Sequence, residues 1–188
     1  MKYIYSFILL LLWSSCARHR SETSWVTVKV DDQVTVSLPA TPQEIDVPGT
    51  MTAVNPARQQ DAMVRSSQAY MLQDTAAVYV IVRIPLAEEP VLLPTFEERK
   101  SYYIERAIPI MLGTDYPNLL EQSITAQDDV DLITVKYKKV DEDGLAIVKY
   151  IRCFTIGKTV YQLHFLPLRQ LGDFNEAERA QFFNSIQL

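Results

Sequence analysis

The chain offers few residue types that could carry out chemistry, and its two cysteines and two histidines come first among them. Cys16 follows Ser14 and Ser15, two small residues that come soon after an apolar run over residues 4–12. Lys2 precedes this run. A basic start, an apolar stretch of about ten residues and small residues at its end are typical of an export signal. The thiol of Cys16 therefore lies where a signal peptide is cleaved, and it is the first candidate for modification.

This segment resembles the lipobox of bacterial lipoproteins, in which the cysteine is acylated and becomes the first residue of the mature protein. Ser14 and Ser15 match the small positions, whereas Trp13 stands where the lipobox usually has leucine. The alternatives are a plain cleaved signal and an uncleaved anchor, although a bilayer span needs about 20 apolar residues. The resemblance implies a signal peptide over residues 1–15, lipidation of Cys16 and stable attachment to a membrane through several acyl chains.

The positions of the second cysteine and of the two histidines in the sequence indicate no reactive centre. Cys153 lies in an apolar stretch and has no intrachain partner once Cys16 is acylated, so we expect a buried, unreactive thiol. His164 alternates with Leu163 and Phe165, which predicts a solvated histidine on a strand. His19 belongs to the segment after the lipid site, and the two histidines form no metal-binding pair.

Other motifs of catalysis are absent from the sequence. The acidic clusters at residues 128–131 and 141–144 do not follow the twelve-residue calcium loop, and they are interpreted as polar turns. The chain has no G-x-S-x-G and no glycine-rich nucleotide motif. We therefore expect a protein that is not an enzyme, with no catalytic residue, no cofactor and no metal site, although two scattered carboxylates could still form a glycosidase site.

Charge and chain length limit the partners. The net charge is −5, and the basic residues form no extended patch, which argues against nucleic acid. The one local basic cluster, residues 18–20, suits anionic lipid headgroups. We interpret residues 16–24 as the lipidated cysteine and a polar tether, whose last eight residues reach at most about 28 Å. The domain is therefore expected close to the membrane surface.

The elements that follow the tether are mostly strands. Alternating or continuous apolar residues predict strands over residues 26–30, 34–38, 68–72, 78–84, 133–138, 145–156 and 159–166. Residues 39–66 contain four prolines and no sustained pattern, which indicates either a long loop or a loop that includes an edge strand without a clear pattern. Thr95 and Glu98 have the spacing of a capping box and predict a helix to about Ala107, which Pro109 should end. The same spacing at Asn175 and Glu178 predicts a terminal helix to about Ser185.

Hairpin-length connections between most of these strands favour an antiparallel sheet, which two amphipathic helices must cover. We therefore predict one α+β domain over residues 25–188, with a mainly antiparallel sheet of six to seven strands flanked by helices. A domain of this size can bury a core of its own.

Three segments carry a second resemblance. They are the strand and Pro-x-x-Pro exit over residues 36–42, the strand pair over residues 152–163 and the helix over residues 182–186. Together they look like the PsbP-like group of domains, named for an extrinsic protein of photosystem II. The resemblance implies an α/β/α sandwich and a non-catalytic accessory or binding role, and it carries over no catalytic residue.

These observations predict a lipid-anchored lipoprotein of the bacterial cell envelope. It would face the extracytoplasmic side, which is the periplasm in a Gram-negative cell, and it would bind the membrane through acylated Cys16 and an envelope protein partner. Its expected role is that of a non-catalytic binding or accessory module. The alternatives are a hydrolase with a cryptic site and a carrier that holds a small ligand between sheet and helix. Tyr102, Tyr103 and Tyr116 are candidates for an exposed aromatic surface, or else pack their rings at the domain edge.

Overall fold

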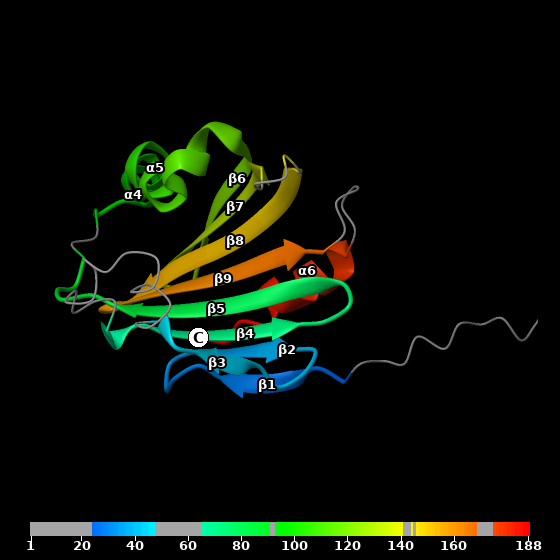
Figure 1. Ribbon diagram of the computed structural model, residues 1–188. Helices are drawn as coiled ribbons and strands as arrows, with labels where there is room; N and C mark the ends of the chain where they lie inside the picture. Colours follow the sequence, from blue (N-terminus) through cyan, green and yellow to red (C-terminus); the bar gives the residue numbers. More distant parts are fainter. Residues whose placement is uncertain (1–23, 48–64, 91–92, 141–143, 145, 169–174) are drawn as a thin grey trace, which may run out of the picture.

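A computed structural model describes residues 24–47, 65–90, 93–140, 144, 146–168 and 175–188. Within these residues, all strand pairings are antiparallel. The helices are fewer and lie on the faces of the sheet (Figure 1). The predicted α+β class is therefore confirmed.

The main sheet has seven strands in the order β3-β4-β5-β9-β8-β7-β6. Their bounds are β3 Gln43–Ile45, β4 Gln68–Gln73, β5 Ala77–Pro85, β6 Leu119–Gln127, β7 Val130–Val140, β8 Ala146–Ile156 and β9 Thr159–Pro167. The last four strands form a meander, and β9 returns to pair with β5, so that the helical segment between β5 and β6 lies beside the sheet. Buried apolar residues form two clusters, one on each face of the sheet.

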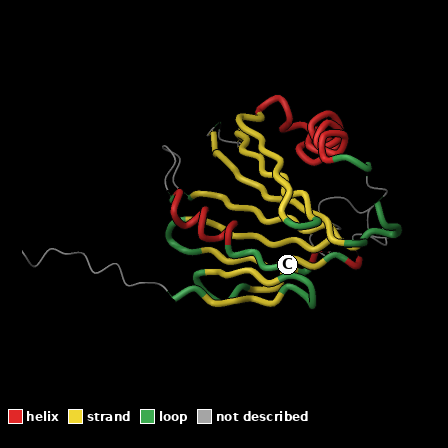
Figure 2. The backbone as a smooth tube through the Cα atoms, turned by 180° about the vertical axis from the view of Figure 1, so that it is seen from behind, coloured by secondary structure: helices red, strands yellow, loops and turns green. Residues whose placement is uncertain are grey.

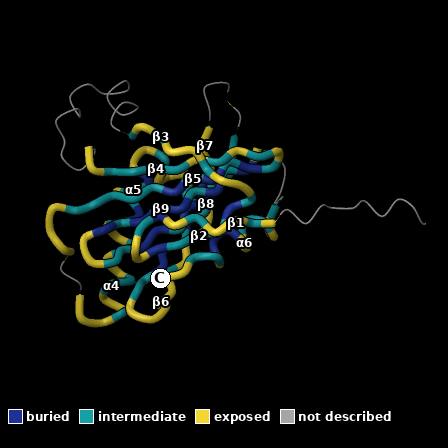
Figure 3. The backbone as a smooth tube through the Cα atoms, turned by 90° about the horizontal axis from the view of Figure 1, so that it is seen from below, coloured by how far each residue is buried: buried dark blue, intermediate teal, exposed yellow. Residues whose placement is uncertain are grey.

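A hairpin and a helix cover one face. The hairpin consists of β1 (Val26–Lys29) and β2 (Thr35–Leu38), and the helix is α6 (Glu176–Asn184), which Figure 2 shows lying against the sheet. Val36 and Leu38 of the hairpin and Phe182 of α6 are fully buried against Tyr79 and other residues of the central strands. Figure 3 shows the buried backbone concentrated in this central part of the molecule. We call this the hairpin face.

The second face is covered by a composite helix. It begins with α4 (Phe96–Tyr102), continues through the π-helical η2 (Tyr103–Ala107) and α5 (Ile108–Leu112), and ends in the 3₁₀ segment η3 (Gly113–Asn118). Ile108 and Leu112 pack on Val135, Ile151 and other residues of β7 and β8. We call this the helix face.

The predicted end of the helix at Pro109 is wrong. Pro109 has no N–H to donate, and in a regular α-helix its ring would collide with the carbonyl four residues earlier. Here the preceding turn is π-helical, and the N–H of Ile108 donates to the carbonyl of Tyr103, five residues back. The wider turn places Pro109 near the start of α5, where a missing N–H is tolerated, so the helix continues to Leu112.

Some of the other local predictions are confirmed and others are wrong. The hairpin, the strands β4, β5, β7, β8 and β9 and the capping box of Thr95 and Glu98 are confirmed. Of the two interpretations of residues 39–66, the structure supports the one with an edge strand, because β3 lies at the edge of the main sheet. The strand β6 was not predicted. The second capping box is also wrong. Asn175 adopts a left-handed conformation, and its amide donates to the carbonyl of Ala76 at 3.1 Å instead of capping α6.

Candidate binding site

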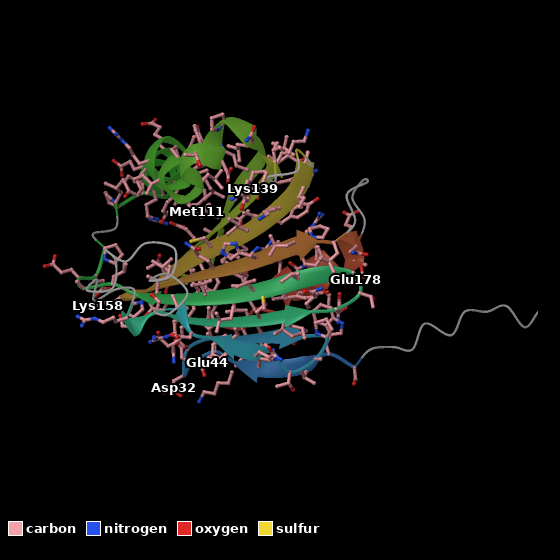
Figure 4. All side chains as sticks on the ribbon, in the orientation of Figure 1. Asp32, Glu44, Met111, Lys139, Lys158 and Glu178 are labelled. Atoms are coloured by element: carbon pink, nitrogen blue, oxygen red, sulfur yellow. The ribbon has the colours of Figure 1, made fainter. Side chains whose placement is uncertain are left out.

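The helix face contains a cavity of about 720 Å³ between the composite helix and the sheet. Its walls come from three parts of the chain: the segment after β5, the composite helix, and strands β7 to β9. The lining residues are Leu86, Pro90, Leu93, Arg99, Tyr102, Tyr103, Ala107, Ile108, Ile110, Met111, Ile133, Cys153, Thr155, Val160 and Gln162. Met111 is labelled in Figure 4, on the part of the helix that faces the sheet.

Most of this wall is apolar. Ile108 and Ile133 are buried at its base, and Met111 and Val160 pack beside them. Other lining residues remain open to solvent: Ile110 is 77% exposed, and Tyr102 and Leu93 are also exposed. The cavity therefore joins a buried apolar floor to an apolar rim that an entering molecule could contact first.

A buried aspartate holds the composite helix against the sheet. The carboxylate of Asp131, on β7, is 6% exposed. It accepts hydrogen bonds from Nε and Nη2 of Arg99 at 2.6 and 3.1 Å, and from the hydroxyl of Tyr103 at 3.0 Å. These bonds, Arg99 first, hold the pKa of Asp131 below its ordinary value although burial opposes the shift. Arg99 and Tyr103 thus reach the cavity with positions fixed by one buried charge.

A small number of polar groups lie on the sheet side of the cavity. Thr155 and Gln162 contribute side chains to its wall. The amide oxygen of Gln162 lies 3.2 Å from Nε2 of His164 on the same strand. Burial, with a smaller contribution from Lys149, lowers the pKa of His164 to about 4, so the ring is neutral at pH 7. The predicted solvated state of His164 is therefore wrong: the residue is half-buried because the sheet and its neighbours exclude water from the ring.

The thiol of Cys153 also reaches the cavity, where it is buried as predicted. Burial raises its pKa to about 12, so at neutral pH it is the protonated, weakly nucleophilic form. Among the described residues that line the cavity, none is an aspartate, glutamate, serine or histidine. The predominantly apolar wall, with few polar groups, can hold an apolar molecule.

The other residues singled out from the sequence have different places. Cys16, His19 and residues 141–143 lie outside the described residues. The interpretation of residues 128–131 as a simple polar turn is wrong for Asp131, which binds Arg99 and Tyr103. Tyr102 and Tyr116 are exposed, as an aromatic surface requires, whereas Tyr103 is half-buried at the Asp131 site.

The alternative of a carrier placed a ligand between sheet and helix, where the cavity lies, but no pattern in the sequence identified most of the residues that line it. The apolar residues on both sides of Pro109 were a usable signal, because a helix that ended there would have left Ile110 and Met111 without a function. Arg99 and Asp131 are 32 positions apart in sequence, and no local pattern indicates that they pair.

Comparisons with known proteins do not add a family. No protein-family model matches the chain, and no curated protein sequence matches it significantly. In the part of the chain that the structure describes, no helix is long and apolar enough to cross a membrane. The same residues contain no group of three or more histidine, cysteine and acidic side chains suited to a metal ion.

Proposed function

We propose that the protein is a lipid-anchored, non-catalytic binding module of the bacterial envelope, which holds an apolar or amphipathic small molecule between the composite helix and the sheet. The observation that carries this proposal is the cavity of about 720 Å³ with its predominantly apolar wall. Small-molecule sites have volumes of about 300–1,000 Å³ and combine apolar walls with a few polar groups. Arg99, Thr155 and Gln162 are such groups here.

The anchor is part of the same proposal. Acylation of Cys16 would hold the domain on the extracytoplasmic side of a membrane, and a short tether would keep the cavity near the lipids and near an envelope protein partner. An amphipathic ligand could then be taken from, or passed to, either of them. The PsbP-like resemblance of the sequence supports an accessory role of this kind.

The anchor is tested by replacing one atom. The Cys16→Ser variant lacks the sulfur that forms the thioether to lipid. We expect it to lose acyl labelling and to leave the membrane fraction, whereas Cys153→Ser keeps both properties. Unchanged acyl labelling of Cys16→Ser would contradict the lipidation of this residue.

The cavity is tested with a photoreactive ligand. The full chain is reconstituted in lipid nanodiscs and exposed to a fatty acid that bears a diazirine at the end of its chain. We expect light-dependent attachment to peptides of the composite helix and of β8 and β9. Ala107→Phe, which adds a ring to the cavity wall, should lower this attachment several-fold. Ala177→Phe makes the same change at an exposed position of α6 and should leave attachment unaltered.

Circular dichroism of both variants checks that the fold is retained. Labelling that spreads over the surface, or that is equal in Ala107→Phe and Ala177→Phe, would contradict the proposed binding site.

A further inference from the structure

A second concave site lies on the opposite side of the sheet from the cavity. This cleft, of about 340 Å³, is bounded by α6 and by the strands β6, β7 and β8. Its lining residues are Glu121, Gln122, Ser123, Thr134, Val135, Lys136, Tyr150, Arg152, Arg179, Ala180, Phe183 and Asn184. In contrast to the cavity, the cleft is rich in polar and cationic side chains.

Three cations line the cleft, and each comes from a different element: Lys136 from β7, Arg152 from β8 and Arg179 from α6. Of the described lining residues, Glu121 alone is acidic, and its exposed carboxylate accepts from Nζ of Lys136 at 2.9 Å. Among the described lining residues, basic side chains therefore outnumber acidic ones by three to one, although the whole chain is acidic.

Arg152 is the most informative of these cations. Its Nε donates to the hydroxyl of Thr134 at 3.1 Å, and its Nη1 donates to the carbonyl of Phe183 at 2.9 Å and lies 3.4 Å from the amide oxygen of Asn184. Among the described residues, none of its hydrogen-bond partners is a carboxylate. Burial lowers the pKa of this guanidinium, because the loss of contact with water disfavours the charged form. A half-buried charge is usually paired with an opposite charge, whereas the described partners of Arg152 are all neutral acceptors.

Aromatic rings restrict the cations further. The guanidinium of Arg152 lies 4.9 Å from the ring centre of Phe183, and that of Arg179 lies 4.1 Å from the ring centre of Tyr150. Nζ of Lys136 lies 5.9 Å from the same Tyr150 ring. Contacts with aromatic faces restrict where these cations can lie. Their positions along the cleft are therefore set before any ligand binds.

We infer that this cleft binds the phosphoryl group of a small soluble molecule, with Arg152 as its central contact and Arg179 and Lys136 as its further cations. The donors come from three elements and surround the cleft, and the hydroxyls of Ser123 and Thr134 lie in the same wall. A tetrahedral phosphoryl group accepts bonds from several directions, whereas a carboxylate is satisfied by one planar guanidinium. The cleft is also larger than one phosphate needs, which leaves space for an attached polar group.

Calorimetric titration of the full chain in a nonionic detergent tests this inference, with glycerol 3-phosphate and succinate as the two probes. We expect glycerol 3-phosphate to bind and succinate to bind more weakly. Arg152→Gln keeps a hydrogen-bonding side chain but removes the charge, and it should weaken glycerol 3-phosphate binding at least about tenfold. Arg179→Gln, at the half-exposed α6 side of the cleft, should weaken it as well and guards against a folding defect in Arg152→Gln.

Arg106→Gln is the matched control, because it removes the same charge from an exposed position on the composite helix. It should leave the affinity unchanged. The inference is overturned if glycerol 3-phosphate does not bind, if succinate binds more tightly, or if Arg106→Gln weakens binding as much as the two cleft variants do.

Discussion

The hairpin face and the helix face of the sheet are each held by an aspartate that binds one arginine and one tyrosine, but the two faces differ in what lies between the layers. On the hairpin face, Asp31 accepts from Nε of Arg83 at 2.8 Å and from the hydroxyl of Tyr161 at 2.6 Å. On the helix face, Asp131 accepts in the same way from Arg99 and Tyr103.

The space beside these two clusters is different. On the hairpin face, the ring of Tyr79 packs edge to face on those of Phe165 and Phe182, with ring centres 5.3 Å apart in each pair, and all three residues are almost completely buried. On the helix face, the same kind of polar contact accompanies a cavity of about 720 Å³. An ion pair can therefore fix the position of the hairpin or of the composite helix against the sheet. The volume of the side chains between them decides whether that space is filled.

The largest expected difference comes from equal truncations on the two faces. Ile81 is 1% exposed in the filled core and Ile133 is 7% exposed beside the cavity, and both lie on strands of the main sheet. We expect Ile81→Ala to lower the free energy of unfolding by about 4 kcal/mol and Ile133→Ala by about 2 kcal/mol, since Ile133 already borders empty space. Urea unfolding of both variants measures this, and equal losses would show that the helix face is packed as tightly as the hairpin face.

Neutralising Asp31 or Asp131 should lower the free energy of unfolding by a smaller amount, and only one of the two changes should affect ligand binding. We expect Asp31→Asn and Asp131→Asn each to cost about 2 kcal/mol, less than a fully buried pair because the arginines are partly exposed. Asp131→Asn should also alter labelling by the photoreactive fatty acid, because Arg99 and Tyr103 line the cavity. Asp31→Asn should leave labelling unchanged, and a loss of labelling in Asp31→Asn would contradict the separation of the two faces.

The smallest expected effect is a dependence on pH that arises on the helix face. The pKa of His164 is about 4 in the folded protein and about 6.5 in the unfolded chain. Between these values the unfolded state binds more protons, so stability falls as the pH falls from 7 to 5, by about 1–2 kcal/mol. The lowered pKa values of Asp31 and Asp131 contribute stability that is lost only at lower pH, as these carboxyls become protonated.

His164→Gln removes the titrating ring from this face. Its free energy of unfolding, measured in urea at pH 7 and pH 5, should change less with pH than that of the wild type. An equal change in both proteins would assign the pH dependence to other groups.

The sequence was informative where a pattern is local. A continuous apolar run identified the strand that carries Tyr79, and alternation identified the strand that carries Phe165. The spacing of Thr95 and Glu98 identified the start of the composite helix. Local rules failed where tertiary contacts prevail. The π-helical turn before Pro109 lets the helix continue, and the polar strand β6 is held by pairing with β7 rather than by its own apolar residues.

The candidate site was less accessible to sequence reasoning than the fold. A cavity is a volume left between elements, and it depends on how far the composite helix stands from the sheet. That distance is set in part by Asp131 and Arg99, which meet only in the folded chain. The cationic cleft has the same origin, because its cations are contributed by three separate elements.

Native mass spectrometry of the full chain, extracted from its own membranes in a mild detergent, tests the central claim most directly. We predict that the wild type and Ala177→Phe carry an additional non-covalent mass, that of one small apolar or amphipathic molecule, and that Ala107→Phe does not. The absence of any bound molecule from the wild type, or its equal presence in Ala107→Phe, would contradict a ligand site on the helix face.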